Sequence, residues 1–111
     1  MTVRTPLPVV LARALGRAVG LRVFRVAGPS MEPTLHEGDW VFVSTYRRGL
    51  PRPGSLVVVH DPAGERTLVK RVRSRGTATF AVGSDNPTGA RDSRQFGSLR
   101  PEHLVGHVIG R

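Results

Sequence analysis

The chain contains one lysine, Lys70, beside sixteen arginines. In an extended segment over Thr67–Arg73, side chains alternate between two faces, so Lys70 shares a face with Leu68 and Val72. Burial lowers the pKa of a lysine, whereas a guanidinium stays protonated in a protein. A site that needs a neutral amine as a base therefore accepts lysine and rejects arginine. The alternative is a surface lysine whose stem lies along an apolar edge while its amine reaches solvent. The alternation of side chains alone does not distinguish a buried base from such a surface lysine.

A base needs a nucleophile to activate, and the candidate is Ser30 in the segment VAGPSMEPTLHEGDWVFV. Gly28 and Pro29 predict a turn just before the serine, and Pro33 prevents a regular helix from running through the segment. We therefore expect Ser30 on an irregular loop that can present its hydroxyl and free backbone N–H groups to a carbonyl. Taken alone, Gly-Pro-Ser is an ordinary turn and does not indicate catalysis.

The elements that must position these two residues are short strands. Beyond residue 20, the sequence has short apolar runs rich in Val and Phe and bounded by Gly, Pro, Asp and Ser. We expect a mainly β domain over residues 21–111, with about six strands in a small coiled or partly closed sheet. The strand segments are Leu21–Ala27, Trp40–Tyr46, Leu56–His60, Thr67–Arg73, Thr77–Val82 and Leu104–Ile109. Residues 83–95 are expected to form one long polar loop.

Residues 1–20 form a basic N-terminal segment. The apolar residues after Pro8 follow a three–four spacing, which predicts an amphipathic helix, either packed on its own domain or frayed. Arg13, Arg17 and Arg22 interrupt the apolar stretch. Each would cost about 2.5–3.5 kcal/mol at mid-bilayer, so we expect no transmembrane span. Residues 1–25 carry five arginines and no acidic residue, which leaves peripheral contact with an anionic membrane surface open.

Length and composition restrict the function classes. The chain has 111 residues, with 17 Lys and Arg against 8 Asp and Glu and a net charge of +9, which indicates one basic domain. The absence of cysteine excludes a disulfide scaffold, a thiolate nucleophile and a Cys-based metal site. No pattern of His, Asp and Glu completes a metal site, so we expect neither metal nor cofactor. We do not interpret Asp85, Asp92 and Glu102 as a catalytic pair of carboxylates, because ion pairing with Arg91 and Arg94 or loop hydrogen bonds are the nearer explanation.

Three segments together resemble the type I signal peptidase family of Ser-Lys proteases. In chain order they are GPSMEPTLHEGDWVFV, similar to the nucleophile segment, LVKRV, similar to the general-base segment, and SDNPTGARDSRQFG followed by LVGHV, similar to the C-terminal segment. The resemblance covers residues 22–110. Each motif is weak alone, but the three in this order with compatible spacing are specific. The resemblance implies a β catalytic core and serine endopeptidase activity.

The resemblance also implies roles for particular residues. Ser30 would be the nucleophile and Lys70 the general base, a Ser-Lys variant of the catalytic triad. The backbone N–H of Ser30 would donate to the oxyanion. Met31 and Gly28 would contribute to substrate binding, with Met31 lining the pocket for a small residue, usually Ala, before the scissile bond. The residues implied as structural support of the site are Asp92, Arg94 and Asn86.

Two positions depart from the family pattern. Many relatives place a serine hydroxyl, a second oxyanion donor, where this chain has Gly28. Relatives also carry a serine that hydrogen-bonds the base lysine, and counting back from Asp92 that position is Ala90 here. The sequence therefore leaves the orientation of Lys70 without an evident side-chain partner.

The short spacer between Lys70 and Gly83 leaves no room for the second β domain of larger family members. This short form resembles the branch of nickel-type superoxide dismutase maturation proteases, which remove an N-terminal extension so that the new N-terminus can ligate nickel. We therefore expect a precursor polypeptide with an N-terminal extension as the substrate. The expected location is cytoplasmic, with peripheral membrane contact left open.

Two alternatives of other classes remain. The net charge of +9 motivates a small basic nucleic-acid-binding β domain, although the aromatic residues are expected in apolar strand contexts rather than as exposed stacking platforms, so no nucleic-acid partner is expected. The other alternative is a catalytically inactive peptidase-like module in which the hydroxyl and the amine no longer meet.

Overall fold

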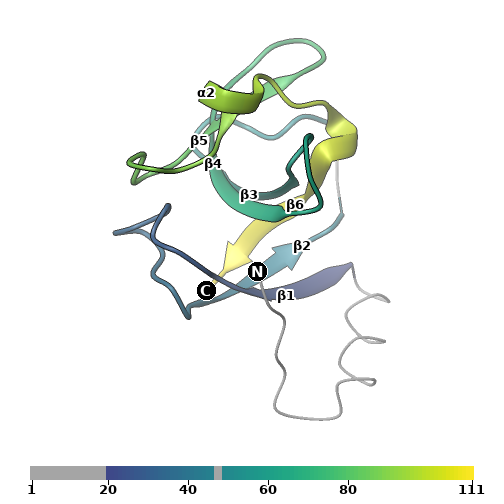
Figure 1. The fold of residues 1–111 in the computed structure, drawn as a ribbon. Coiled ribbons are helices and arrows are strands. Elements are labelled where there is room, and N and C mark those ends of the chain that lie inside the picture. The colour runs from purple at the N-terminus through teal and green to yellow at the C-terminus, as the bar shows by residue number, and fades with distance from the viewer. Residues whose placement is uncertain (1–19, 47–48) are drawn as a thin grey trace.

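The structure is a computed structural model that describes residues 20–46 and 49–111 (Figure 1). The strands in these ranges are β1 (Leu21–Arg25), β2 (Trp40–Ser44), β3 (Leu56–His60), β4 (Thr67–Arg75), β5 (Phe80–Gly83) and β6 (Leu104–Gly110). Two short helical elements, α2 (Ser93–Phe96) and the 3₁₀ helix η1 (Pro101–His103), lie between β5 and β6. The prediction of a mainly β fold with six short strands is therefore confirmed. The helix expected in the N-terminal segment lies outside the described residues, and the domain boundary at residue 20 stays a prediction.

The six strands form one antiparallel sheet in the order β1-β2-β6-β3-β4-β5. The sheet curves strongly around β3, β4 and β6 (Figure 1), which agrees with the coiled sheet expected from the sequence, and it is not closed. The free edge of β5 is covered instead by a bridge in which Phe80 and Leu99 exchange backbone hydrogen bonds of 2.9 and 2.7 Å.

Both faces of the central strands are buried. The apolar run of β3 separates by alternation, since Val58 packs in one hydrophobic cluster while Val57 and Val59 pack in the other. A continuous apolar run is typical of a strand covered on both faces. The first cluster also contains Phe24, Val26, Met31, Leu35, Val41, Val43, Val69 and Val105, and the second contains Val72, Phe80, Val82, Leu99 and Leu104.

Some aromatic side chains lie outside this core. Phe24 and Phe80 are buried, as expected, but Phe42 and Tyr46 are 40% and 68% exposed, so the expectation of apolar surroundings is wrong for these two. Phe42 alternates with Val41 and Val43, which point into the core, and it therefore lies on the outward face of β2. Within residues 20–46 and 49–111, no helix has the length and apolar character needed to cross a membrane.

Candidate active site

Ser30 and Lys70, forty residues apart in sequence, meet in the structure. The distance from Lys70 Nζ to Ser30 Oγ is 3.3 Å. Strand β4 carries Lys70, and its neighbours alternate as predicted, because Leu68 and Val72 pack with one hydrophobic cluster and Val69 with the other. Lys70 is only 2% exposed, so the alternative of a lysine that extends into solvent is wrong.

The surroundings of Lys70 favour its neutral form. Burial lowers the pKa of the Lys70 amine below its ordinary value of 10.5, and this effect outweighs the opposing influence of the Asp92 carboxylate. The positive charges of Arg66 and Arg94 lower this pKa further. An amine in this position can act as a proton acceptor toward a hydroxyl that it contacts.

Ser30 lies on the loop between β1 and β2. A hydrogen bond of 3.1 Å from Glu32 N to Pro29 O closes a turn around Ser30, as the Gly-Pro-Ser pattern predicts. Gly28 has a φ of 80°, a backbone conformation that suits glycine and strains other residues. The absence of a side-chain hydroxyl at this position therefore has a backbone reason. Within the described ranges, the N–H of Ser30 has no hydrogen-bond acceptor in the protein.

Asp85 and Asn86 attach the Ser30 loop to the strands that hold the lysine. Thr34 Oγ1 donates a hydrogen bond of 2.6 Å to Asp85, and Arg71, next to Lys70, donates two of 2.8 Å to the same carboxylate. Asn86 N donates to Ser30 O at 2.8 Å, and its side-chain amide donates to Pro29 O at 3.2 Å. The hydrogen bonds from Arg71 hold the pKa of Asp85 below its ordinary value. Asn86 thus contacts the backbone of Ser30 directly, and its role as structural support of the site stays a prediction.

Ser84 contacts Lys70, and sequence reasoning missed it. Lys70 Nζ donates a hydrogen bond of 2.8 Å to Ser84 Oγ, and Ser84 Oγ donates one of 2.9 Å to Asp92 Oδ2. Ser84 is 4% exposed. The sequence feature that could have indicated Ser84 is the alternation of Phe80, Val82 and Ser84 at the end of β5, which places all three on one buried face. Ala90, the position at which relatives carry a serine, has no side-chain hydroxyl to take this role.

Asp92 and Arg94 lie directly behind Ser84. Asp92 caps α2 by accepting a hydrogen bond from Arg94 N at 3.0 Å, and the Arg94 guanidinium binds the same carboxylate at 3.0 and 3.2 Å. Burial by itself would raise the pKa of Asp92, but the hydrogen bonds from Arg94 and Ser84 outweigh it and hold the pKa below its ordinary value. The ion pair of Asp92 and Arg94 is as expected from the sequence. It reaches β4 through the hydroxyl of Ser84.

Arg91 has a different partner from the one expected. Its guanidinium binds the buried carboxylate of Asp61, which follows β3, and these hydrogen bonds hold the pKa of Asp61 below its ordinary value. Asp85, in turn, pairs with Arg71. The expected pairing of Asp85 with Arg91 or Arg94 is therefore wrong, because Asp85 follows β5 and the pairing of β5 with β4 places Arg71 opposite Gly83.

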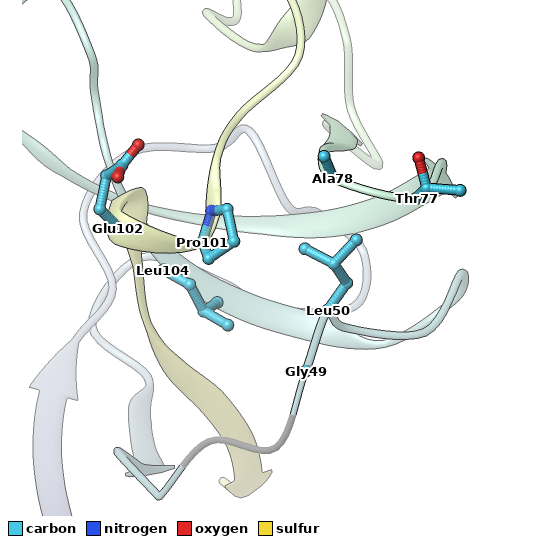
Figure 2. A pocket seen from close by; sticks show the side chains of 7 residues that line it. All are labelled: Gly49, Leu50, Thr77, Ala78, Pro101, Glu102 and Leu104. Atoms are coloured by element: carbon cyan, nitrogen blue, oxygen red, sulfur yellow. The ribbon is translucent and has the colours of Figure 1, made fainter.

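The two residues implied in substrate binding lie beside Ser30. Met31 is 1% exposed and packs in the first hydrophobic cluster, under the loop, and Gly28 is partly exposed. Their contact with substrate stays a prediction. A separate pocket of about 590 Å³ is lined by residues that include Leu50, Pro101 and Leu104 (Figure 2). Ser30, Lys70 and the residues around them do not line this pocket.

Comparisons with known proteins give the class of this fold and site. Residues 1–77, which include Ser30 and Lys70, match the model of the family described as signal peptidase, peptidase S26, and the chain belongs to this family. Over 68 residues it is 35% identical to a probable signal peptidase I of Mycobacterium leprae (strain TN). That match covers 55% of this chain and 24% of the relative. Ser84, Asp92 and Arg94 lie beyond the residues that match the family model.

Proposed function

We propose that the chain is a serine endopeptidase that removes an N-terminal extension from a precursor polypeptide, with Ser30 as the nucleophile and Lys70 as the general base. The observation that carries the proposal is the 3.3 Å distance between Lys70 Nζ and Ser30 Oγ, at a lysine that is 2% exposed. Membership of the signal peptidase family supports peptidase activity. The residues around the pair supply the remaining parts of the reaction.

In the first half of the reaction, the neutral amine of Lys70 accepts the proton of the Ser30 hydroxyl while Oγ forms a bond to the scissile carbonyl carbon. The negative charge that develops on the carbonyl oxygen is stabilised by the backbone N–H of Ser30. When the C–N bond breaks, the Lys70 ammonium returns the proton to the leaving amine. The products of this half are a new N-terminus and an ester between Ser30 and the extension.

In the second half, a water molecule attacks the ester carbonyl. Lys70 again accepts a proton, now from the water, and then gives it to Ser30 Oγ as the ester bond breaks. The extension leaves with a free carboxylate, and Ser30 and Lys70 return to their starting states. No cofactor takes part in this scheme.

The proposed substrate follows from the resemblance stated above. The short spacer between Lys70 and Gly83 supports the branch that matures nickel-type superoxide dismutase, and a small residue is expected before the scissile bond. Ser30 is partly exposed on its loop, which suits attack on an extended polypeptide rather than on an enclosed small molecule. We propose a cytoplasmic location, with peripheral contact to an anionic membrane through residues 1–25 as an open part of the proposal.

The geometry bears differently on the two alternatives. An inactive module requires the hydroxyl and the amine to be apart, whereas Ser30 and Lys70 are within hydrogen-bond distance. A nucleic-acid-binding domain is motivated by the net charge of +9. The two exposed aromatic residues, Phe42 and Tyr46, would be its stacking positions, and a salt-dependent binding assay with single-stranded oligonucleotides would detect it.

The test is the intact mass of a nickel superoxide dismutase precursor after incubation with the protein. We expect loss of the N-terminal extension with the wild type, and no cleavage with Ser30→Ala, Lys70→Arg or Lys70→Met, because none of these retains both a hydroxyl and a neutral amine. Ser55→Ala, which deletes a hydroxyl that donates to Arg52 O within its own turn, should cleave like the wild type. Cleavage by Lys70→Arg at a substantial rate would overturn the general-base role. Cleavage of an unselected peptide mixture but not of this precursor would overturn the proposed substrate and leave the proposed endopeptidase activity standing.

A further inference from the structure

A buried hydroxyl lies between the amine and an acidic side chain. Ser84 Oγ is 2.8 Å from Lys70 Nζ and 2.9 Å from Asp92 Oδ2. The three residues are 4%, 2% and 1% exposed, respectively. Solvent therefore does not compete for these hydrogen bonds, and their directions are determined by the protons available within the group.

The direction of the bond to Asp92 can be derived from charge. The Asp92 carboxylate binds the Arg94 guanidinium and accepts the Arg94 backbone N–H, so it is ionised and can only accept. Ser84 has one hydroxyl proton, and this proton must point to Asp92. The lone pairs of Ser84 Oγ are then directed at Lys70, so Ser84 accepts a hydrogen bond from the amine.

This arrangement fixes the orientation of the amine. A neutral lysine amine has two N–H bonds and one lone pair in a tetrahedral arrangement. With one N–H bond directed at Ser84, rotation of the amine about its bond to Cε is restricted, and the lone pair can be held toward Ser30 Oγ at 3.3 Å. Without Ser84, the amine would have no side-chain acceptor other than Ser30 within the described residues.

From these contacts we propose that Ser84 is the positioning residue of the base. Asp92, which is bound by Arg94, orients the Ser84 hydroxyl, and this hydroxyl accepts a hydrogen bond from Lys70 and so orients the amine. The inference rests on the proposed function of Ser30 and Lys70. It places the positioning hydroxyl at the end of β5, opposite Lys70 on β4, rather than at position 90 in the loop before α2. The sheet register, and not the loop, then sets the geometry of the base.

The single lysine allows a direct test that does not need activity. In protein labelled with ¹³C at lysine Cε, one side-chain signal reports the protonation of Lys70, because the chain has no other lysine. Ser84→Ala removes an acceptor of the ammonium form, so we expect the pKa of Lys70 to fall below that of the wild type. We also expect kcat to fall about 10- to 100-fold while KM changes little, since the base is misoriented and the substrate contacts remain.

Two further variants separate positioning from stability. Ser84→Cys keeps the shape of the side chain with a weaker acceptor, so its effects should have the same sign and be smaller. Ser93→Ala deletes a hydroxyl that accepts from Val82 N at 2.8 Å, next to the same elements but without contact to Lys70. It should lower the melting temperature and leave both the lysine titration and kcat unchanged at equal folded fraction.

The proposal is overturned if Ser84→Ala leaves the lysine titration or kcat as in the wild type, or if Ser93→Ala shifts both to the same extent. Failure of the proposed function has a different signature. In that case Ser30→Ala would cleave like the wild type, while the titration of Lys70 in Ser84→Ala would still show whether Ser84 holds the amine.

Discussion

Lys70 lies among charges that nearly cancel one another. An isolated ammonium buried to this degree loses several kcal/mol of solvation, which is about the cost that drives a lysine toward its neutral form. A lone Asp92 carboxylate would reverse this effect, but Asp92 is paired with Arg94 through two guanidinium hydrogen bonds. The pair carries little net charge, and burial therefore determines the direction of the pKa shift of Lys70.

Arg94 should accordingly control the base from a distance. Arg94→Ala removes the compensating charge from Asp92, so we expect the pKa of Lys70 to rise and the cleavage rate at neutral pH to fall about ten-fold. Arg100→Ala is the matched control, because the Arg100 guanidinium forms an exposed pair with Glu102 at 3.6 Å. Melting temperatures and single-turnover rates of both variants decide the matter. Equal rates at equal folded fraction would remove Arg94 from the site.

Strand pairing explains what could and could not be read from the sequence. Alternation within β4 places Lys70 with Leu68 and Val72, and this was predictable because it depends on a single strand. The partner of Lys70 could not be predicted in this way. Arg71 lies opposite Gly83 and Val72 opposite Val82, so the next pair along the ladder is Lys70 and Ser84. This register depends on which strands pair and on the turn between them, neither of which a single sequence specifies.

The short helix α2 was missed for a related reason. Its four residues are too few to show a helical repeat in the sequence, and the first three of them fall within the polar loop predicted over residues 83–95. The helix is fixed by its ends, where Asp92 and Gln95 form a capping box, and by Ser93, whose hydroxyl accepts from Val82 in β5. Of these side-chain hydrogen bonds, the capping box is local in sequence, whereas the bond between Ser93 and Val82 depends on tertiary contact.

The insertion of β6 between β2 and β3 depends on a close approach at Gly106. A Cβ at this position would overlap the carbonyl oxygen of Ser44 on β2, whereas a Cβ at Gly110 would make an ordinary contact with Phe42 at 3.7 Å. We expect Gly106→Ala to lower the free energy of unfolding by about 1–3 kcal/mol and Gly110→Ala to change it by less than about 0.5 kcal/mol. Urea unfolding of the two variants measures this. Similar values for both would show that β2 and β6 do not approach as described.

The attachment of the Ser30 loop to β4 should be sensitive to acid. The pKa of Asp85 lies below its ordinary value of 3.8 in the folded protein. The stability from its bonds to Arg71 and Thr34 is therefore complete above about pH 4 and is lost as the pH falls through the folded pKa. We expect Asp85→Asn to cost about 2–3 kcal/mol at pH 7, with the difference from the wild type shrinking below pH 3.8. A difference that stays constant over this range would contradict the role of the charge.

The excess of arginine gives the whole molecule a net charge of +9, and residues 1–25 contribute five arginines without an acidic residue. Any attachment to an anionic membrane should then be electrostatic, and it should be screened as the Debye length falls to about 3 Å at 1 M salt. We expect binding to anionic vesicles at low salt, release at high salt, and weaker binding after Arg13→Gln with Arg17→Gln. Binding that resists 1 M salt, or that is equal on neutral vesicles, would contradict this expectation.

The pH dependence of kcat/KM, with chemistry rate-limiting, tests most directly whether a neutral Lys70 takes the proton of Ser30. The acid limb of this profile reports the essential base of the free enzyme. Because burial lowers the pKa of Lys70 below 10.5, we expect kcat/KM to rise tenfold per pH unit up to a midpoint below that value and then to level off. This midpoint should equal that of the single lysine signal in the free protein. A flat profile from mildly acidic to alkaline pH, or a midpoint that differs from the lysine titration, would contradict the central claim.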